Sequence, residues 1–97
     1  MYGTTMIGKL AAGVTGEDIQ QELKSWIAQR ETPGFKTAHI QVGDDGTTIV
    51  NVAVFESEAA YKALADDPAQ DEWWRTHMAP KLDGDPQWID GTWYSGH

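Results

Sequence analysis

The sequence predicts an α+β domain of the ferredoxin-like type, in which a β-α-β-β-α-β order builds one antiparallel sheet covered by helices on one face. Three observations support this fold class. An amphipathic helix lies between two segments of strand character, a pair of alternating strands brackets a Gly-Asp-Asp-Gly turn, and a second helical stretch precedes a last strand. The 97 residues suffice for one domain, residues 1–97, with a core of modest size.

The first strand is expected over Thr4 to Ala11, and a marked helix follows it. Thr15 suits the N-cap, and acidic residues occupy the first turn. The helix runs to about Glu31 and stops at Pro33, because a proline pushes the preceding residue out of helical geometry. One face of it carries Ile19, Leu23, Trp26, Ile27 and Arg30, which implies one covered side.

The next two strands, residues 35–42 and 47–55, are expected to form a hairpin with a three-residue loop in which Gly46 has positive φ. This register places His39 opposite Asn51 on one face of the sheet. The other face then collects Ala38, Ile40, Val42, Thr48, Val50, Val52 and Val54. Because both faces carry large apolar groups, we expect one to meet the helices and the other to meet a second protomer.

The second helical region is interrupted. A helix from Glu58 to Ala65 is followed by a second one from Pro68 to Met78, with Asp67 as its N-cap. Gln70, three residues after this cap, fits the reciprocal arrangement of a capping box. Pro80 ends this region, and a last strand is expected over Gln87 to Tyr94.

The helix from Pro68 to Met78 carries an unusual face. At 3.6 residues per turn, the same side receives Gln70, Trp73, Trp74, His77 and Met78. Indole, imidazole and amide groups stand where an ordinary core stripe has aliphatic side chains. This face therefore either packs bulky groups or lines a cavity.

Composition excludes several classes of function. The net charge of −8 argues against nucleic acid and against anionic membrane surfaces as partners. The absence of cysteine removes disulfides and thiolate metal sites and fits a cytoplasmic location. No stretch approaches the roughly 20 apolar residues of a membrane span. The segment MYGTTMIGKL has no basic patch followed by an apolar run, so no export signal is expected. His39, His77 and His97 lack the spacing of metal ligands, so no metal or other cofactor is expected.

Three segments resemble the dimeric α/β-barrel superfamily and, within it, the antibiotic biosynthesis monooxygenase-like domains. They are Pro33-Gly34-Phe35 at the entry to the second strand, Val52 to Trp74, and the proline-containing helix exit from Ala79 to Trp88. The resemblance covers nearly the whole chain. It implies a homodimer joined through its sheets, with a small ligand between the sheet and the helices. Some members of this family oxidise aromatic polyketide-type molecules with dioxygen alone, and others degrade haem.

The leading hypothesis from this resemblance is a cofactor-independent monooxygenase that acts on a small aromatic or polyketide-type molecule. His77 is expected to be the catalytic base that removes a proton from a phenol or enol. The substrate contacts are expected from Trp73, Trp74, Tyr61, Asn51 and His39. The alternative is a non-catalytic ligand-binding or structural dimer. Haem degradation fits less well, since the first strand lacks the asparagine that the haem-degrading branch uses.

Overall fold

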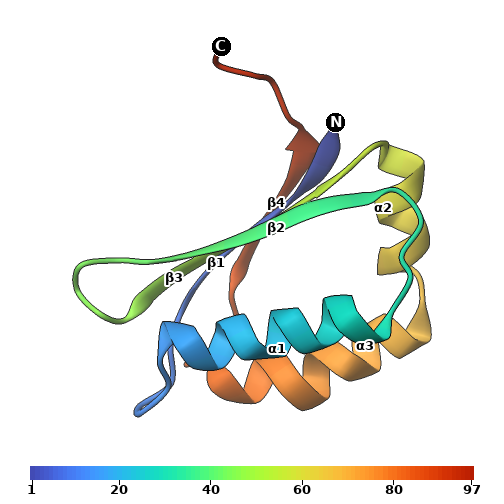
Figure 1. Ribbon diagram of the computed structural model, residues 1–97. Coiled ribbons are helices and arrows are strands. Elements are labelled where there is room, and N and C mark those ends of the chain that lie inside the picture. The colour runs from blue at the N-terminus through green and yellow to red at the C-terminus, as the bar shows by residue number, and fades with distance from the viewer.

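The computed structural model describes residues 1–97 and has the order of elements that the sequence predicts. Four strands form one antiparallel sheet in the order β2-β3-β1-β4, with bounds β1 (Tyr2–Lys9), β2 (Phe35–Val42), β3 (Thr48–Phe55) and β4 (Gln87–Thr92). The α-helices are α1 (Gly16–Gln29), α2 (Glu58–Ala65) and α3 (Pro68–Trp73). All three lie on one side of the sheet and leave the other side bare (Figure 1). The ferredoxin-like fold class is confirmed.

Local chemistry fixes where α1 begins. The hydroxyl of Thr15 accepts a hydrogen bond from the backbone N–H of Asp18 at 3.3 Å, and the Asp18 carboxylate accepts one from the Thr15 N–H at 2.9 Å. This reciprocal capping box satisfies two amide donors at the helix start. The chain turns after the helix at Gly34, whose positive φ of 78° is open to glycine at low cost. Ile19 and Trp26 are the buried residues of the helix.

The β2–β3 hairpin differs from the prediction by one residue in its loop. The Gly43 N–H donates to the Thr48 carbonyl, so the loop has four residues, 44–47, and the predicted three-residue loop is wrong. Asp45 accounts for the longer loop, because its carboxylate accepts hydrogen bonds from Thr47 N, Thr48 N and Thr48 Oγ1 at 2.9, 2.9 and 2.6 Å. An aspartate that binds the backbone two and three residues ahead is a strong turn former. Gly46 does have positive φ, at 75°.

This one-residue difference exchanges the two faces of β3. In the observed register Asn51 lies opposite Ile40, and His39 lies opposite Val52. The predicted His39–Asn51 pair is therefore wrong, since neighbouring residues of a strand point to opposite faces. The covered face carries Met6, Ala38, Ile40, Val42, Ile49, Asn51, Ala53 and Phe55, and the bare face carries Thr5, Ile7, Thr37, His39, Gln41, Val50, Val52, Val54 and Ile89.

The packed core occupies part of the space between sheet and helices. It consists of Met6, Leu10, Ile19, Ile49, Met78 and Leu82. Leu10 and Leu82 form an isolated β-bridge that ties the end of β1 to the segment before β4. No helix combines the length and the apolar character that crossing a membrane requires. Beside this core, the covered face is surrounded by aromatic side chains.

Candidate functional site

A cavity of about 390 Å³ lies between the sheet and the helices. This volume falls within the roughly 300–1,000 Å³ of typical small-molecule sites. Twelve of its sixteen lining residues are hydrophobic, and the rings among them are Trp26, Phe35, Phe55, Tyr61, Trp73, Trp74 and Trp88. The polar side chains of the lining belong to Thr4, Asn51, Gln70 and Asp71.

Small side chains on the sheet leave this space open. Ala38 on β2 and Ala53 on β3 face each other in register and form part of the cavity floor. On the helix side, the chain breaks at Asp67, whose carboxylate caps α3 by accepting from the Ala69 N–H at 3.0 Å. The break ends α2 and starts α3 in a new direction (Figure 1). Methyl groups on the floor and large rings on the walls bound a space that they do not fill.

The walls are held by contacts between rings. Trp26 lies 6.0 Å from Trp73 and 5.4 Å from Phe35, measured between ring centroids. Phe55 continues the series, at 5.6 Å from Phe35 and 5.5 Å from Tyr61. The planes are tilted or perpendicular, which is the favourable geometry for aromatic pairs. Each ring therefore restrains its neighbour, and the walls are preorganised for a flat apolar ligand.

Asn51 is the unpartnered polar group of this cavity. Its Oδ1 atom is buried and has no hydrogen-bond partner, and it is the one buried side-chain oxygen or nitrogen in that condition. Its neighbours in register are Met6 and Ile40, which offer no side-chain donor. A buried acceptor without a donor costs about 1–3 kcal/mol. Because Asn51 also lines the cavity, its amide is a candidate group for contact with a ligand.

Gln70 joins two helices across the cavity wall. Its Oε1 accepts hydrogen bonds from Trp26 Nε1 at 2.8 Å and from Arg30 Nη1 at 3.1 Å. The second nitrogen of the same guanidinium donates to the Ala69 carbonyl at 3.1 Å. Gln70 thus fixes the Trp26 indole, and the expectation that it completes a capping box with Asp67 is wrong. The amide oxygen of Gln70 is occupied instead by two donors, the Trp26 indole on α1 and the guanidinium of Arg30, the C-cap residue of that helix.

Tyr61, Thr4 and Asp90 form a polar cluster beside the apolar walls. Asp90 Oδ1 accepts hydrogen bonds from Thr4 Oγ1 at 2.6 Å and from the Tyr61 hydroxyl at 3.1 Å. Thr4 and Asp90 are partners in the β1–β4 register, so both lie on the covered face. Burial is the largest cause that raises the pKa of Tyr61, and the nearby Asp90 charge raises it further. Tyr61 is therefore a neutral donor at physiological pH.

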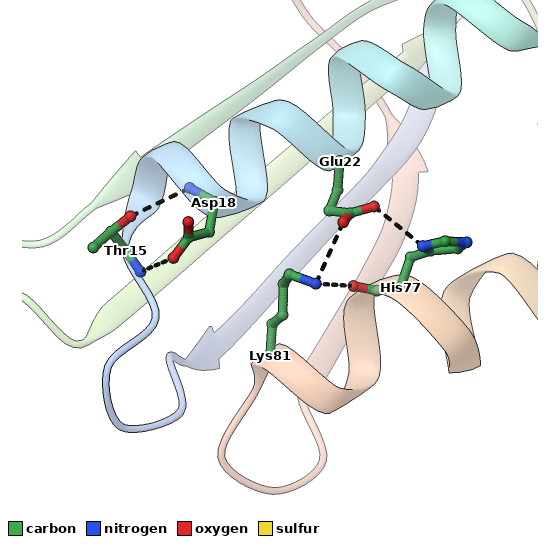
Figure 2. A network of polar contacts seen from close by, with 5 residues as sticks. All are labelled: Thr15, Asp18, Glu22, His77 and Lys81. Atoms are coloured by element: carbon green, nitrogen blue, oxygen red, sulfur yellow. Dashed lines mark hydrogen bonds and ion pairs between the residues drawn. The ribbon is translucent and has the colours of Figure 1, made fainter.

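His77 lies outside the lining of the cavity. Its Nδ1 is 3.3 Å from Glu22 Oε2, its side chain is 47% exposed, and Glu22 also pairs with Lys81 at 3.4 Å (Figure 2). The Lys81 ammonium donates to the His77 carbonyl at 3.0 Å, which closes the network (Figure 2).

A π-helical segment, Trp74–Met78, explains the position of His77. The Ala79 N–H donates to the Trp74 carbonyl, five residues back, so each residue here turns less about the axis than in an α-helix. Trp73 and Trp74 line the cavity and Met78 is buried. The imidazole of His77 lies outside the lining, with its ring centroid 6.0 Å from that of Trp73. The uniform period of 3.6 residues does not apply beyond Trp73.

Of the site residues expected from the sequence, the structure brings together Trp73, Trp74, Tyr61 and Asn51 around the cavity. His39 lies on the bare face and donates to or accepts from Thr37 Oγ1 through Nε2 at 3.1 Å. Sequence reasoning missed Thr4 and Asp90. The alternation of β4 offers a signal, because Trp88 and Asp90 share a face. No group of three or more His, Asp or Glu side chains is placed to hold a metal ion.

Comparisons with known proteins support the fold. No protein-family model and no curated protein matches the sequence. Among solved structures, a monooxygenase from the gene ActVA-Orf6 of Streptomyces coelicolor, in complex with nanaomycin D, is 25% identical, with a TM-score of 0.73 over 99% of this chain and 89% of that one.

Two other solved structures show the range of chemistry on this fold. SnoaB, a cofactor-independent oxygenase from Streptomyces nogalater, is 15% identical with a TM-score of 0.66 over 91% of this chain and 90% of that one. A hydroxynitrile lyase from Passiflora edulis is 14% identical, with a TM-score of 0.66 over 92% and 89%. The chain has the ferredoxin-like fold of these proteins, and antibiotic biosynthesis monooxygenases are among its structural neighbours. The resemblance seen in the sequence is confirmed at this level.

Proposed function

We propose that this protein is a cofactor-independent monooxygenase that oxidises a small, flat aromatic molecule of the polyketide type. The observation that carries the proposal is the cavity of about 390 Å³, walled by preorganised rings and holding one unpartnered amide. The solved monooxygenase that binds nanaomycin D and the oxygenase SnoaB, which have the same fold, favour this class of reaction over others.

The walls supply orientation and a dry environment. Trp26, Trp73 and Trp74 offer faces and edges against which an aromatic ligand stacks, and Phe35 and Phe55 exclude water from its other side. A low-dielectric site strengthens each polar contact made inside it. The carboxamide of Asn51 then binds an oxygen of the substrate and fixes which carbon faces dioxygen. Its unused Oδ1 suits a hydroxyl of the ligand.

Anthrone is a suitable probe substrate for this reaction. Loss of a proton gives its enolate, which is electron-rich enough to react with dioxygen without an added cofactor. The overall change is anthrone plus O₂ to anthraquinone plus H₂O, in which the methylene carbon is oxidised and dioxygen is reduced. The protein contributes by holding the enol oxygen and by taking up the proton.

Oxygen uptake with anthrone tests the proposal. We expect the wild type to take up oxygen faster than the protein-free autoxidation of anthrone. The rate should be about tenfold lower in Asn51→Leu and unchanged in the control Gln41→Leu, which changes a residue of the bare face. The variant His77→Ala tests the base that the sequence predicts. Because the His77 ring lies outside the lining of the cavity, we expect this variant to keep at least half of the wild-type rate.

Two outcomes would redirect this assignment. Ligand binding without any oxygen uptake would favour the alternative, a non-catalytic binding protein. A rate in Asn51→Leu equal to that of the wild type would remove Asn51 from the reaction.

We also infer that the bare face of the sheet joins two copies of the chain. The aliphatic side chains of this face belong to Ile7, Val50, Val52, Val54 and Ile89. The side chain of Ile89 is 53% exposed in the single chain. A contiguous apolar surface without cover is typical of an interaction site. The expected homodimer leaves the cavities on the outside of the assembly, each next to its own helices.

A further inference from the structure

Two hydroxyl groups of the cavity lining donate hydrogen bonds to the same carboxylate. Asp90 Oδ1 receives hydrogen bonds from Thr4 at 2.6 Å and from Tyr61 at 3.1 Å, and both of these residues line the cavity. Asp71 also lines the cavity, but its carboxylate pairs with Arg75 at 3.1 Å and both side chains are largely exposed. Asp90 is therefore the acid group best connected to the interior.

We propose that Asp90 is a positioning residue that makes Tyr61 and Thr4 hydrogen-bond acceptors, so that this end of the cavity selects aromatic ligands with a free hydroxyl and takes up their proton. The inference rests on the proposed function and adds to it the class of substrate, a phenol or enol, and the route of its proton. No part of it involves His77.

The three side chains differ in the number of protons that they can donate. An ionised carboxylate only accepts hydrogen bonds, whereas each hydroxyl has one proton to donate and two lone pairs. Asp90 Oδ1 takes the proton of both hydroxyls. Tyr61 and Thr4 are left with lone pairs alone, and they can meet a ligand only as acceptors. Their orientation is set before the ligand arrives, because a hydrogen bond to a charged acceptor is stronger than one to water or a neutral group.

Selectivity follows from this arrangement. A phenolic or enolic O–H offers the donor that Tyr61 Oη lacks. A ligand with hydrogen in place of that hydroxyl leaves the oxygen without a partner in a partly buried position, which costs binding free energy. Sites built to bind a hydroxyl reject analogues that lack it much more strongly than apolar pockets reject a change of size. Asn51, with its free Oδ1, provides a second acceptor on the same cavity.

The same contacts give the proton a route to water. The ligand hydroxyl transfers its proton to Tyr61 Oη as Tyr61 transfers its own proton to Asp90 Oδ1. One O–H bond breaks and one forms in each transfer, the ligand keeps the bonding electron pair as its anion, and no group is oxidised or reduced. Asp90 is exposed, so it returns the proton to solvent and is ready for the next ligand.

The test compares two ligands that differ by one hydroxyl, 2-hydroxyanthraquinone and anthraquinone, in titrations followed by quenching of tryptophan fluorescence. Four of the five tryptophans line the cavity, so the signal is local. We expect the wild type to bind the hydroxylated ligand about tenfold more tightly. Asp90→Ala should bring the ratio of the two dissociation constants close to one, and Asp90→Glu should restore part of it.

Two further variants keep the test decisive. Tyr61→Phe keeps the ring and should also lower the ratio, even if Asp90→Ala folds poorly. Asp85→Ala removes a carboxylate from the loop before β4 and should leave the ratio unchanged. Equal affinity for both ligands in the wild type, an unaltered ratio in Asp90→Ala, or no binding of either ligand would overturn the inference.

Oxygen uptake with anthrone separates this inference from the proposed function. A hydroxyl preference that depends on Asp90, without oxygen uptake, would refute the oxygenase and support the recognition. Oxygen uptake without a preference for the hydroxylated ligand would support the oxygenase and refute the recognition of the hydroxyl.

Discussion

The two faces of the sheet are built from alternate residues of the same strands, yet they differ in what they do with apolar surface. The bare face presents β-branched residues, among them Val50 and Val52, that no helix covers. The covered face presents alanines and one asparagine among aromatic side chains, and it borders a cavity that is open to solvent on one side. An uncovered face with a row of valines suits a second copy of the chain, whereas a hollow face with an unpartnered amide oxygen suits a small ligand.

The largest expected effect comes from a charge on the bare face. Val52 lies near the centre of that face, between Thr5 and His39 in register, so Val52→Asp would bury a carboxylate in the proposed dimer. Such a charge costs several kcal/mol, and we expect dimer dissociation to rise by at least about a hundredfold. Light scattering measures this at micromolar concentration, with Gln20→Asp on the exposed side of α1 as a control. A wild-type protein that is already a monomer would contradict the assignment of this face.

A smaller effect is expected at the wall of the covered face. Gln70→Leu leaves the Trp26 indole N–H without its acceptor and removes one contact of Arg30. We expect a loss of about 2 kcal/mol in the free energy of unfolding, measured with urea. Gln70→Glu keeps an acceptor for both donors and should cost much less. Equal losses in the two variants would show that the hydrogen bonds do not hold this wall.

At the floor of the cavity, removal of a polar group should increase stability. Asn51→Leu replaces a buried acceptor that has no partner with an apolar group of similar volume, so we expect a gain of about 1 kcal/mol in the free energy of unfolding. Gln41→Leu, on the bare face, should give no gain in the monomer because Gln41 is exposed. A variant of Asn51 that is more stable but less active marks a residue kept for function. A loss of stability in Asn51→Leu would count against this reading.

The smallest effect concerns the turn that assigns residues to the two faces. Hydrogen bonds lower the pKa of Asp45 from 3.8 to about 2. The largest contribution comes from the Thr48 side chain, followed by the backbone N–H groups of Thr48 and Thr47. Because this pKa is lower in the folded state, the stabilisation is fully present above pH 4 and is lost as the pH falls towards 2. The difference in unfolding free energy between the wild type and Asp45→Asn should therefore shrink over this range. A difference that is constant with pH would contradict the role of the carboxylate.

The sequence predicts the order and bounds of most elements, because caps and breakers are local. Ser57 and Thr15 mark helix starts, and α2 and β2 have the expected bounds. The predicted assignment of β3 residues to the two faces is wrong, because it depends on the length of one loop. Apolar segregation favours a three-residue loop in the sequence, whereas the Asp45 hydrogen bonds that set the observed length of four are visible only in the structure. The position of His77 fails because the π-helical turn has no simple sequence signature. Asp90 was not expected in the site because its partners lie far away in the chain.

The five tryptophans allow a direct comparison of the two faces. Trp26, Trp73, Trp74 and Trp88 line the cavity, whereas Trp93 lies over Gly3 on the bare face, where a Cβ added to Gly3 would stand 2.6 Å from its Nε1. Two-dimensional ¹H–¹⁵N spectra of the indole N–H groups, recorded during titration with 2-hydroxyanthraquinone, test the site with one sample. We expect the four cavity indoles to shift with saturation and Trp93 to stay in place. Shifts confined to Trp93, or no shift in any of the five, would contradict the cavity as the ligand site.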